Sequence, residues 1–337
     1  MHALVCRQPG MLELETRPIP TRGEGEALVR PLRVGICGTD YHIYEGKHPF
    51  LEYPRVMGHE LAVEVLEAPP GCGFEAGEIS VVNPYISCGS CIACRSGKPN
   101  CCVRIAVLGV HRDGGMASLL GLPAANLVKA DGLSVDACAT VEFLAIGAHA
   151  VRRSGAGTGQ RGLVIGAGPI GLGVALFAGI AGVELSMLDL SPERLEVARA
   201  LTGASSIVAG VDAAAAAAAL TGGEGYDVVF DATGNANSMQ KGFDFVAHGG
   251  TYVLVSVVKG PISFEDPDFH RREMSLLGSR NATSEDFSRV IAAIAGGRVP
   301  VDKLITHRTT LAGAITDLPV WATQKQGLIK AVIEIAA

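Results

Sequence analysis

The sequence predicts an α/β protein that combines a β-rich domain with a doubly wound parallel sheet. Short apolar runs broken by glycine and proline fill residues 1 to about 150, a pattern typical of strands joined by loops. From about residue 154 to 285, apolar runs alternate with helical stretches. That alternation indicates parallel strands covered by helices on both faces of the sheet.

The composition fits such a chain and argues against several other classes. A length of 337 residues suits about two domains, and 48% hydrophobic residues allow a sizeable core. The net charge of −6, with no basic run that carries interleaved aromatics, argues against a nucleic-acid surface. The first residues lack the pattern of a signal peptide, and no apolar run is long enough to span a bilayer. We therefore expect a cytoplasmic protein with neither a nucleic-acid nor a membrane partner.

A glycine-rich turn at residues 166–171 predicts a dinucleotide site. An apolar run ends at Gly166, Gly168 and Gly171 complete a G-x-G-x-x-G pattern, and an apolar helical stretch follows. The glycines allow a tight turn and a close approach of the pyrophosphate, and the N–H groups of the helix N-terminus bind phosphate. We expect the cofactor to contact the turn and the start of the helix, at Gly166, Gly168, Pro169, Ile170 and Gly171.

The next apolar run ends on Asp189, about 20 residues after the turn, where a carboxylate accepts hydrogen bonds from the adenosine ribose. Since its charge repels a 2′-phosphate, Asp189 favours NAD over NADP. Arg194 keeps NADP open as the weaker alternative, because a guanidinium can bind that phosphate. In the segment between Asp189 and Arg194, Ser191 is suited to cap a helix and Pro192 to occupy its first position.

Four cysteines at a metal-binding spacing predict a structural zinc site. Cys88, Cys91, Cys94 and Cys102 follow the pattern C-x2-C-x2-C-x7-C, and four thiolates satisfy tetrahedral zinc. An iron–sulfur cluster is the main rival. Bacterial ferredoxin runs, however, place the fourth cysteine after three residues and follow it with proline, whereas here Val103 follows. Reduced free thiols are a further alternative. Spacing alone does not decide whether Cys101 or Cys102 is the fourth ligand.

Two other segments carry metal-ligand residues and suggest a catalytic zinc site. GICGTDYH contains Cys37, and MGHE contains His59 and Glu60. A catalytic zinc takes three protein ligands and leaves one position open. Cys37 and His59 supply two of them, and Glu142 in ATVEFLAIGAHAV is the best candidate for the third. Glu60 is a weaker candidate that could exchange with water on the metal.

Together with YPRVMGHE, VLGVHRDGG, DATG and LIKAVIEI, these motifs resemble the zinc-dependent medium-chain dehydrogenase/reductase superfamily over essentially the whole chain. This is the group of alcohol, sorbitol and threonine dehydrogenases. The resemblance implies a discontinuous GroES-like catalytic domain (residues 1–153 and 287–337) and a Rossmann NAD-binding domain (residues 154–286). It also implies two zinc ions per chain and a homo-oligomer, either a dimer or a tetramer.

The resemblance also assigns roles to single residues. It places the catalytic zinc on Cys37, His59 and Glu142, and the structural zinc on the four cysteines. Thr39 resembles the hydroxyl that takes the substrate proton, and His42 the relay towards solvent. Asp40 resembles a residue that orients His59.

Three segments resemble bacterial sugar-acid dehydrogenases of the L-galactonate oxidoreductase type: PFLEYPRVMGHE, DPDFHRREMSLLGSRNATSEDF and VEFLAIGAHAVRR. This resemblance implies oxidation of a secondary hydroxyl of an aldonate, whose carboxylate needs a cationic partner. The candidate substrate contacts are Lys47, His48, His111, Arg112 and Arg280. A neutral polyol such as an alditol is the alternative substrate, and a non-catalytic nucleotide-binding protein is the alternative outside this class.

Overall fold

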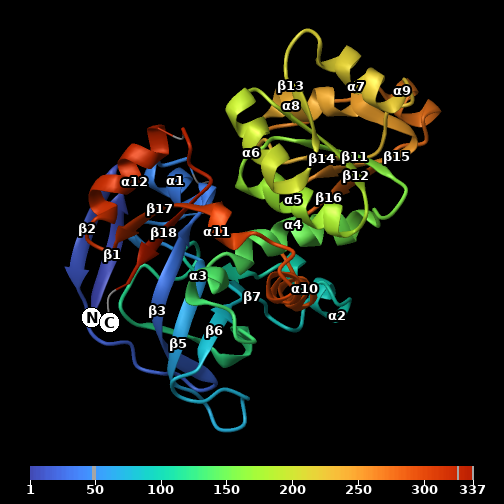
Figure 1. Cartoon of the computed structure of the whole chain (residues 1–337). Helices are drawn as coiled ribbons and strands as arrows, with labels where there is room; N and C mark the ends of the chain where they lie inside the picture. Colours follow the sequence, from blue (N-terminus) through green and yellow to red (C-terminus); the bar gives the residue numbers. More distant parts are fainter. Residues whose placement is uncertain (48–50, 325, 336–337) are drawn as a thin grey trace. The chain divides into compact units, whose positions relative to one another are not determined.

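The computed structural model describes residues 1–47, 51–324 and 326–335, and the chain divides into two compact units (Figure 1). The first unit comprises Met1–Phe143 and Thr283–Ala337, and the second comprises Leu144–Ala282. The predicted domain boundaries, after residues 153 and 286, fall inside α4 (Val141–Ser154) and α10 (Ser284–Ala295), and they remain a prediction.

The first unit is built around a seven-stranded sheet in the order β10-β6-β5-β3-β18-β17, with β9 also paired to β3. A second sheet has the order β2-β1-β4, and β7 pairs with β8. The strands of this unit are β1 (His2–Gln8), β2 (Met11–Thr16), β3 (Glu26–Ile36), β4 (Arg55–Val56), β5 (Glu60–Glu67), β6 (Ile79–Val82), β7 (Tyr85–Ile86), β8 (Ala106–Val107), β9 (Leu120–Pro123), β10 (Leu127–Lys129), β17 (Ile305–Thr310) and β18 (Lys330–Glu334).

Short helices connect these strands. They are α1 (Gly38–Tyr44), α2 (Ile92–Arg95), α3 (Val135–Cys138), α11 (Val301–Leu304), α12 (Ala314–Thr323) and the 3-10 helices η1 (Pro99–Cys101) and η2 (Ala124–Asn126), in addition to α10. Apolar side chains from β1, β3, β5 and α12 form the core. The alternating burial along β3 follows from the alternating side-chain directions of a strand.

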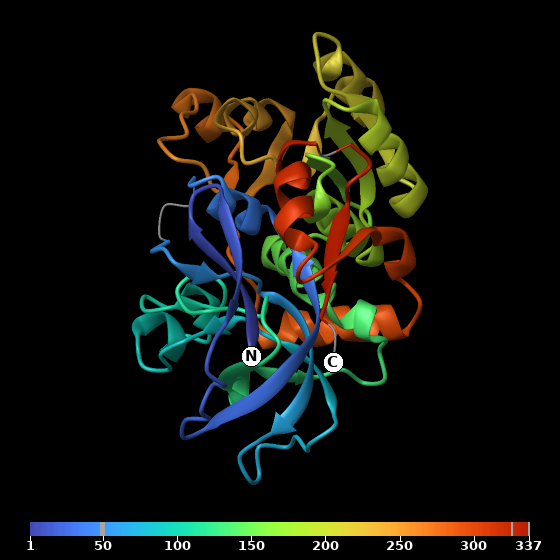
Figure 2. The ribbon, with the colours of Figure 1, turned by 90° about the vertical axis from the view of Figure 1, so that its left-hand side faces the viewer.

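The pairing of β18 with β3 brings the end of the chain to the middle of the large sheet. The two strands lie side by side (Figure 2). They are antiparallel, and Ala331 lies opposite Ile36. On the other side of β3, Gly35 lies opposite Glu60 at the start of β5. The end of β3 and the beginnings of β5 and β18 are therefore neighbours in the sheet.

The second unit confirms the predicted doubly wound parallel sheet. Its six strands have the order β13-β12-β11-β14-β15-β16, and the chain runs outward from β11 to β13 before it crosses to β14. The elements are β11 (Arg161–Ile165), β12 (Glu184–Asp189), β13 (Ser205–Val208), β14 (Tyr226–Asp231), β15 (Val246–Leu254), β16 (Ser275–Gly278), α5 (Pro169–Ile180), α6 (Pro192–Thr202), α7 (Ala213–Thr221), α8 (Ala236–Lys241), α9 (Asp266–Arg271) and η3 (Gly242–Phe245). Ligands bind such sheets where the strand order reverses, here between β11 and β14.

The predicted start of α6 is confirmed in detail. The Ser191 hydroxyl accepts a hydrogen bond of 3.2 Å from the N–H group of Arg194, and Pro192 occupies the first helical position. Within the part of the chain that the structure describes, no helix has both the length and the apolar character needed to cross a membrane.

Asp136 links two arginines in the first unit and offers a test of its stability. Its Oδ1 accepts from Arg33 Nε at 3.0 Å, and its Oδ2 accepts from Arg308 Nη2 at 2.6 Å. The hydrogen bond from Arg308 is the main cause that lowers the pKa of Asp136. The charged carboxylate therefore stabilises the fold above the unfolded-state pKa of about 3.9. That contribution is lost as the pH falls through the lower folded-state pKa.

We predict that Asp136→Asn lowers the free energy of unfolding of the first unit by about 1 kcal/mol at pH 7. The difference from the wild type should shrink as the pH approaches 3. Denaturant unfolding followed by the fluorescence of Trp321 measures it, because this is the single tryptophan of the sequence and lies on α12. Glu285→Gln, which removes the exposed pair with Arg289, is the control and should cost less. A difference that persists undiminished in acid would contradict the prediction.

Candidate metal and cofactor sites

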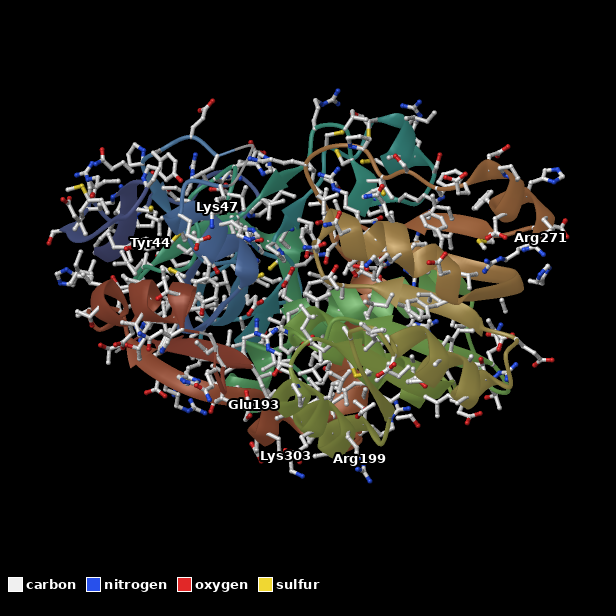
Figure 3. The ribbon with its side chains drawn as sticks, turned by 90° about the horizontal axis from the view of Figure 1, so that it is seen from above. Tyr44, Lys47, Glu193, Arg199, Arg271 and Lys303 are labelled. Carbon is white, nitrogen blue, oxygen red and sulfur yellow. The ribbon has the colours of Figure 1, made fainter. Side chains whose placement is uncertain are left out.

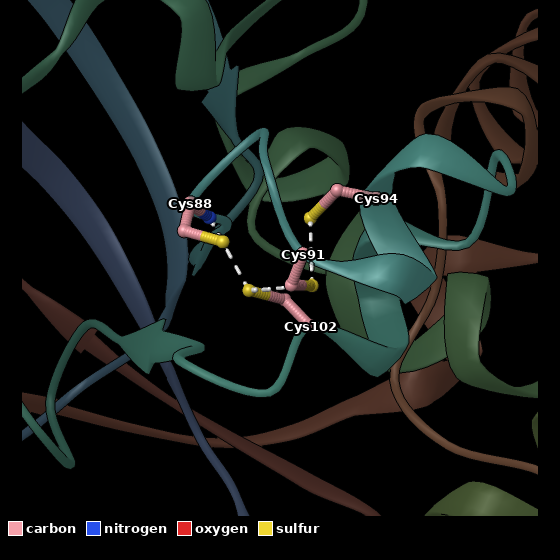
Figure 4. A group of neighbouring side chains, drawn as sticks. All are labelled: Cys88, Cys91, Cys94 and Cys102. Carbon is pink, nitrogen blue, oxygen red and sulfur yellow. Dashed lines mark hydrogen bonds between the residues drawn. The ribbon is translucent and has the colours of Figure 1, made fainter.

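The four predicted cysteines come together in the loop that follows β7. Their sulfur atoms all lie within 4.8 Å of one another (Figure 4). Cys91 Sγ is 3.5 Å from Cys94 Sγ and 3.9 Å from Cys102 Sγ. Such a group of sulfurs suits a single tetrahedral ion. The structure also separates the two adjacent cysteines, because Cys102 is buried and joins the group whereas Cys101 is exposed.

Backbone amides of the loop favour the thiolate form that binds a metal. The N–H group of Ser90 is the largest cause that lowers the pKa of Cys88, to about 5. The N–H group of Cys94 likewise lowers the pKa of Cys91 to about 7, whereas desolvation raises the pKa of Cys94 to about 11. The donor set and its amides therefore fit a structural zinc.

We predict that Cys102→Ser reduces bound zinc from two ions to one ion per chain and lowers the thermal midpoint, because the site loses a thiolate ligand. Elemental analysis of the purified protein measures the change. Cys101→Ser removes the neighbouring thiol and should keep both ions. Equal zinc loss in the two variants would show that the burial of Cys102 does not identify the ligand.

A second candidate site lies where β3, β5 and β18 meet. The ligand atoms of Cys37, His59 and Glu60 lie within 4.8 Å of one another. Burial disfavours the charged imidazole, but a hydrogen bond with Cys37 raises the pKa of His59 well above its usual value. Position 35, opposite Glu60 in the sheet, requires glycine, because a Cβ there would overlap the Glu60 carboxylate.

Asp40 holds the two segments of this site together through their backbones. Its Oδ2 accepts a 2.8 Å hydrogen bond from the N–H group of Cys37, and its Oδ1 accepts one of 3.3 Å from Gly58. Gly58 precedes His59 and has a φ of +92°, which favours glycine. Asp40 thus fixes the backbone that carries both Cys37 and His59.

Glu142 stands beside this group, although it is not one of the three clustered residues. It lies in the first turn of α4, and its charge acts on His59. Burial raises the pKa of Glu142 to about 7. Its Oε1 accepts a hydrogen bond from the Tyr85 hydroxyl. Within the described residues, its Oε2 and the Nδ1 of His59 are both buried without a hydrogen-bond partner. Buried polar atoms are normally paired, so a thiol, an imidazole and a carboxylate with such an oxygen fit a zinc ion.

Glu60 is instead engaged by a buried lysine that the sequence analysis missed. Lys330 Nζ lies 2.6 Å and 2.7 Å from the two oxygens of Glu60, and it donates to the carbonyl of Ile36 at 3.3 Å. It also lies 4.3 Å from the centroid of the Phe143 ring. Because Lys330 occupies both oxygens of Glu60, Glu142 is the better candidate for the third ligand. In the sequence, the lysine that begins the apolar run KAVIEI could have indicated this buried ion pair.

We predict that Lys330→Met lowers the free energy of unfolding of the first unit by about 3–5 kcal/mol, because Glu60 is left buried and unpaired. The double variant Lys330→Met/Glu60→Gln should recover part of that loss. Trp321 fluorescence during denaturant unfolding measures both. A loss no larger than that of Asp136→Asn would contradict the assignment of a strongly coupled pair.

Thr39 and His42 lead from Cys37 towards solvent. The Thr39 hydroxyl is 3.9 Å from Cys37 Sγ and is half-buried, whereas His42 is exposed. Because they are three residues apart on α1, the two side chains share one helix face. This order of burial suits a proton path from the site to the surface.

The predicted substrate contacts are largely held by other partners. Lys47, three residues after α1 ends at Tyr44, pairs with Glu45 at 3.0 Å (Figure 3). Arg112 Nη2 pairs with Glu26 at 3.1 Å, and His111 Nδ1 accepts a hydrogen bond from Val107. Arg280 belongs to the second unit, and His48 lies outside the described residues. These five residues remain a prediction.

In the second unit, the glycine-rich turn joins β11 to α5 as the motif predicts. Gly166 has a φ of +99°, and a Cβ on Gly171 would overlap the Gly166 carbonyl. Both positions therefore require glycine. Pro169 and Ile170 form the first turn of α5, where the free N–H groups of a helix start lie.

Asp189 ends β12 and is fastened to this turn. Its Oδ2 accepts a 2.7 Å hydrogen bond from the N–H group of Ala167, and its Oδ1 accepts one of 2.8 Å from Ser191. The sequence predicts ribose contacts for Asp189 but not these backbone bonds. Each carboxylate oxygen keeps further acceptor capacity, so the two roles are compatible.

Each of the two units matches a known family model. Residues 23–132 match the family model described as an alcohol dehydrogenase GroES-like domain, and residues 169–296 match the model described as a zinc-binding dehydrogenase. The chain is 42% identical over 335 residues to L-galactonate-5-dehydrogenase of Escherichia coli K12, covering 99% of this chain and 98% of that protein.

Two further matches also cover most of the chain. One is 2-dehydro-3-deoxy-L-galactonate 5-dehydrogenase of Pseudoalteromonas atlantica, which is 32% identical over 307 residues, with 90% of each chain covered. The other is the crystal structure of an alcohol dehydrogenase of Escherichia coli CFT073 complexed with NADH. It superposes with a TM-score of 0.92 at 29% identity and covers 99% of each chain.

Proposed function

Because the chain belongs to the zinc-binding dehydrogenase family, we propose that it oxidises a secondary hydroxyl of a sugar acid, an aldonate similar to L-galactonate, with NAD as hydride acceptor. The family resemblance of the sequence motifs is confirmed, and the chain is a dehydrogenase that acts on CH–OH groups of a small molecule. The proposed substrate class rests on one observation, the 42% identity to L-galactonate-5-dehydrogenase over 99% of the chain.

Cys37, His59 and Glu142 would hold the catalytic zinc, and the four clustered cysteines would hold the structural zinc. A bound catalytic zinc supplies a Lewis acid that lowers the pKa of the substrate hydroxyl. The Thr39 hydroxyl would then accept the released proton and donate its own to His42, whose exposed ring passes it to solvent. His59 Nδ1 and Glu142 Oε2, which are buried without a hydrogen-bond partner among the residues that the structure describes, support this ligand set.

NAD would bind the second unit, with its pyrophosphate at the turn of residues 166–171 and its ribose at Asp189. The crystal structure of a relative with NADH supports this assignment. Asp189 is already held beside the turn by Ala167, so its negative charge is fixed where a 2′-phosphate would approach. NAD is therefore preferred to NADP. An oligomer of identical subunits remains a proposal that rests on the family resemblance.

We predict that the zinc-loaded protein reduces NAD with an aldonate such as L-galactonate far faster than with the matching neutral alditol. The absorbance of NADH at 340 nm measures both rates across a panel of hexonates and alditols. Cys37→Ser should abolish the activity, because the catalytic zinc loses a ligand, whereas Cys101→Ser should retain it. Activity confined to neutral alditols would contradict the sugar-acid proposal, and full activity of Cys37→Ser would contradict the zinc mechanism.

A further inference from the structure

Tyr85 is a buried tyrosine whose hydroxyl donates a hydrogen bond to a residue of the candidate zinc site. It donates a hydrogen bond to Glu142 Oε1, and the side chain is 8% exposed. Its ring meets Phe287 edge to face, with a centroid distance of 6.5 Å and an interplanar angle of 78°. The ring is therefore packed on one side while the hydroxyl is directed at the carboxylate.

The backbone of Tyr85 is fixed as well as its ring. Its N–H group donates to Asn83 Oδ1 at 3.1 Å, and its carbonyl accepts from Asn126 Nδ2 at 3.4 Å. Tyr85 also pairs with Val107 across the β7–β8 ladder. The hydroxyl is thus presented from a rigid element, so it can hold a partner in one orientation.

The two buried glutamates of the site differ in the donors that hold them. The Lys330 ammonium reaches both oxygens of Glu60. The Tyr85 hydroxyl carries a single proton and occupies only Oε1 of Glu142, so that Oε2 has no partner among the described residues. Both oxygens of Glu60 are therefore occupied by a hydrogen-bond donor, whereas Oε2 of Glu142 is available to bind a cation.

We propose that Tyr85 is a positioning residue that holds Glu142 Oε1, so that Oε2 serves as the third ligand of the catalytic zinc. The inference rests on the ligand set proposed above. Partners of a metal ligand orient it, and their loss commonly costs about 10–100-fold in metal affinity. Tyr85 acts through Glu142 and is therefore a positioning residue and not a catalytic one.

A double-mutant cycle tests the proposal. Wild type, Tyr85→Phe, Glu142→Gln and the double variant are loaded with zinc, and the rate of zinc loss to a chelator is followed for each protein. Tyr85→Phe removes only the hydroxyl and keeps the ring packed on Phe287. Tyr252→Phe is the matched control, because its buried hydroxyl donates to the carbonyl of Met239 in the second unit. The zinc of the four cysteines serves as an internal reference for a folded protein.

We expect Tyr85→Phe to accelerate loss of the catalytic zinc by about 10–100-fold, and Tyr252→Phe to leave the rate unchanged. In the Glu142→Gln background, Tyr85→Phe should add little, because its effect passes through that carboxylate. The visible spectrum of the cobalt-substituted protein should change in Tyr85→Phe and stay the same in Tyr252→Phe.

Three results would overturn the proposal. If Glu142→Gln accelerates zinc loss but Tyr85→Phe behaves like Tyr252→Phe, the positioning role fails while the ligand set stands. If neither Glu142→Gln nor Tyr85→Phe changes the rate or the cobalt spectrum, Glu142 is not a ligand and the proposed site fails with it. Effects of the two substitutions that simply multiply in the double variant would also count against the proposal, since they would act independently.

Discussion

The concentration of buried carboxylates beside Cys37 is the constraint on which the first unit depends. Asp40, Glu60 and Glu142 are each at most 1% exposed, and the buried ammonium of Lys330 pairs with Glu60. Burial of carboxylates without a cation is costly, and here it raises the pKa of Asp40 and of Glu142. A divalent ion between Cys37, His59 and Glu142 would offset that charge. The buried carboxylates therefore affect both the stability of the first unit and its capacity to bind a metal ion.

The sheet topology makes this concentration of charge possible. Cys37 follows the end of β3, Glu60 begins β5, and Lys330 begins β18, and these three strands are neighbours. Because β5 and β18 run antiparallel to β3, their beginnings lie beside its end. A chain whose last strand did not return to the middle of the sheet would bury Glu60 without its partner. The discontinuous first unit is thus a requirement of the site.

The sequence was sufficient for features whose residues lie close together in the chain. The cysteine loop and the glycine-rich turn are local, so spacing and residue type predict them. Lys330 and Tyr85 escaped notice because their partners are 270 and 57 residues away, and only the folded sheet brings them together. Burial, which spacing does not reveal, separated Cys102 from Cys101. The backbone bonds of Asp189 likewise depend on β11 and β12 ending side by side.

An anomalous difference map at the zinc edge, from crystals of the purified protein, would locate the metal ions and their ligands. We expect two peaks per chain, one among the four clustered sulfurs and one contacted by Cys37, His59 and Glu142 Oε2. A peak at the cysteines alone would contradict the claim that the buried acidic groups require a metal. A second peak ligated by Glu60, with Lys330 displaced, would contradict the assignment of Glu142 as the third ligand.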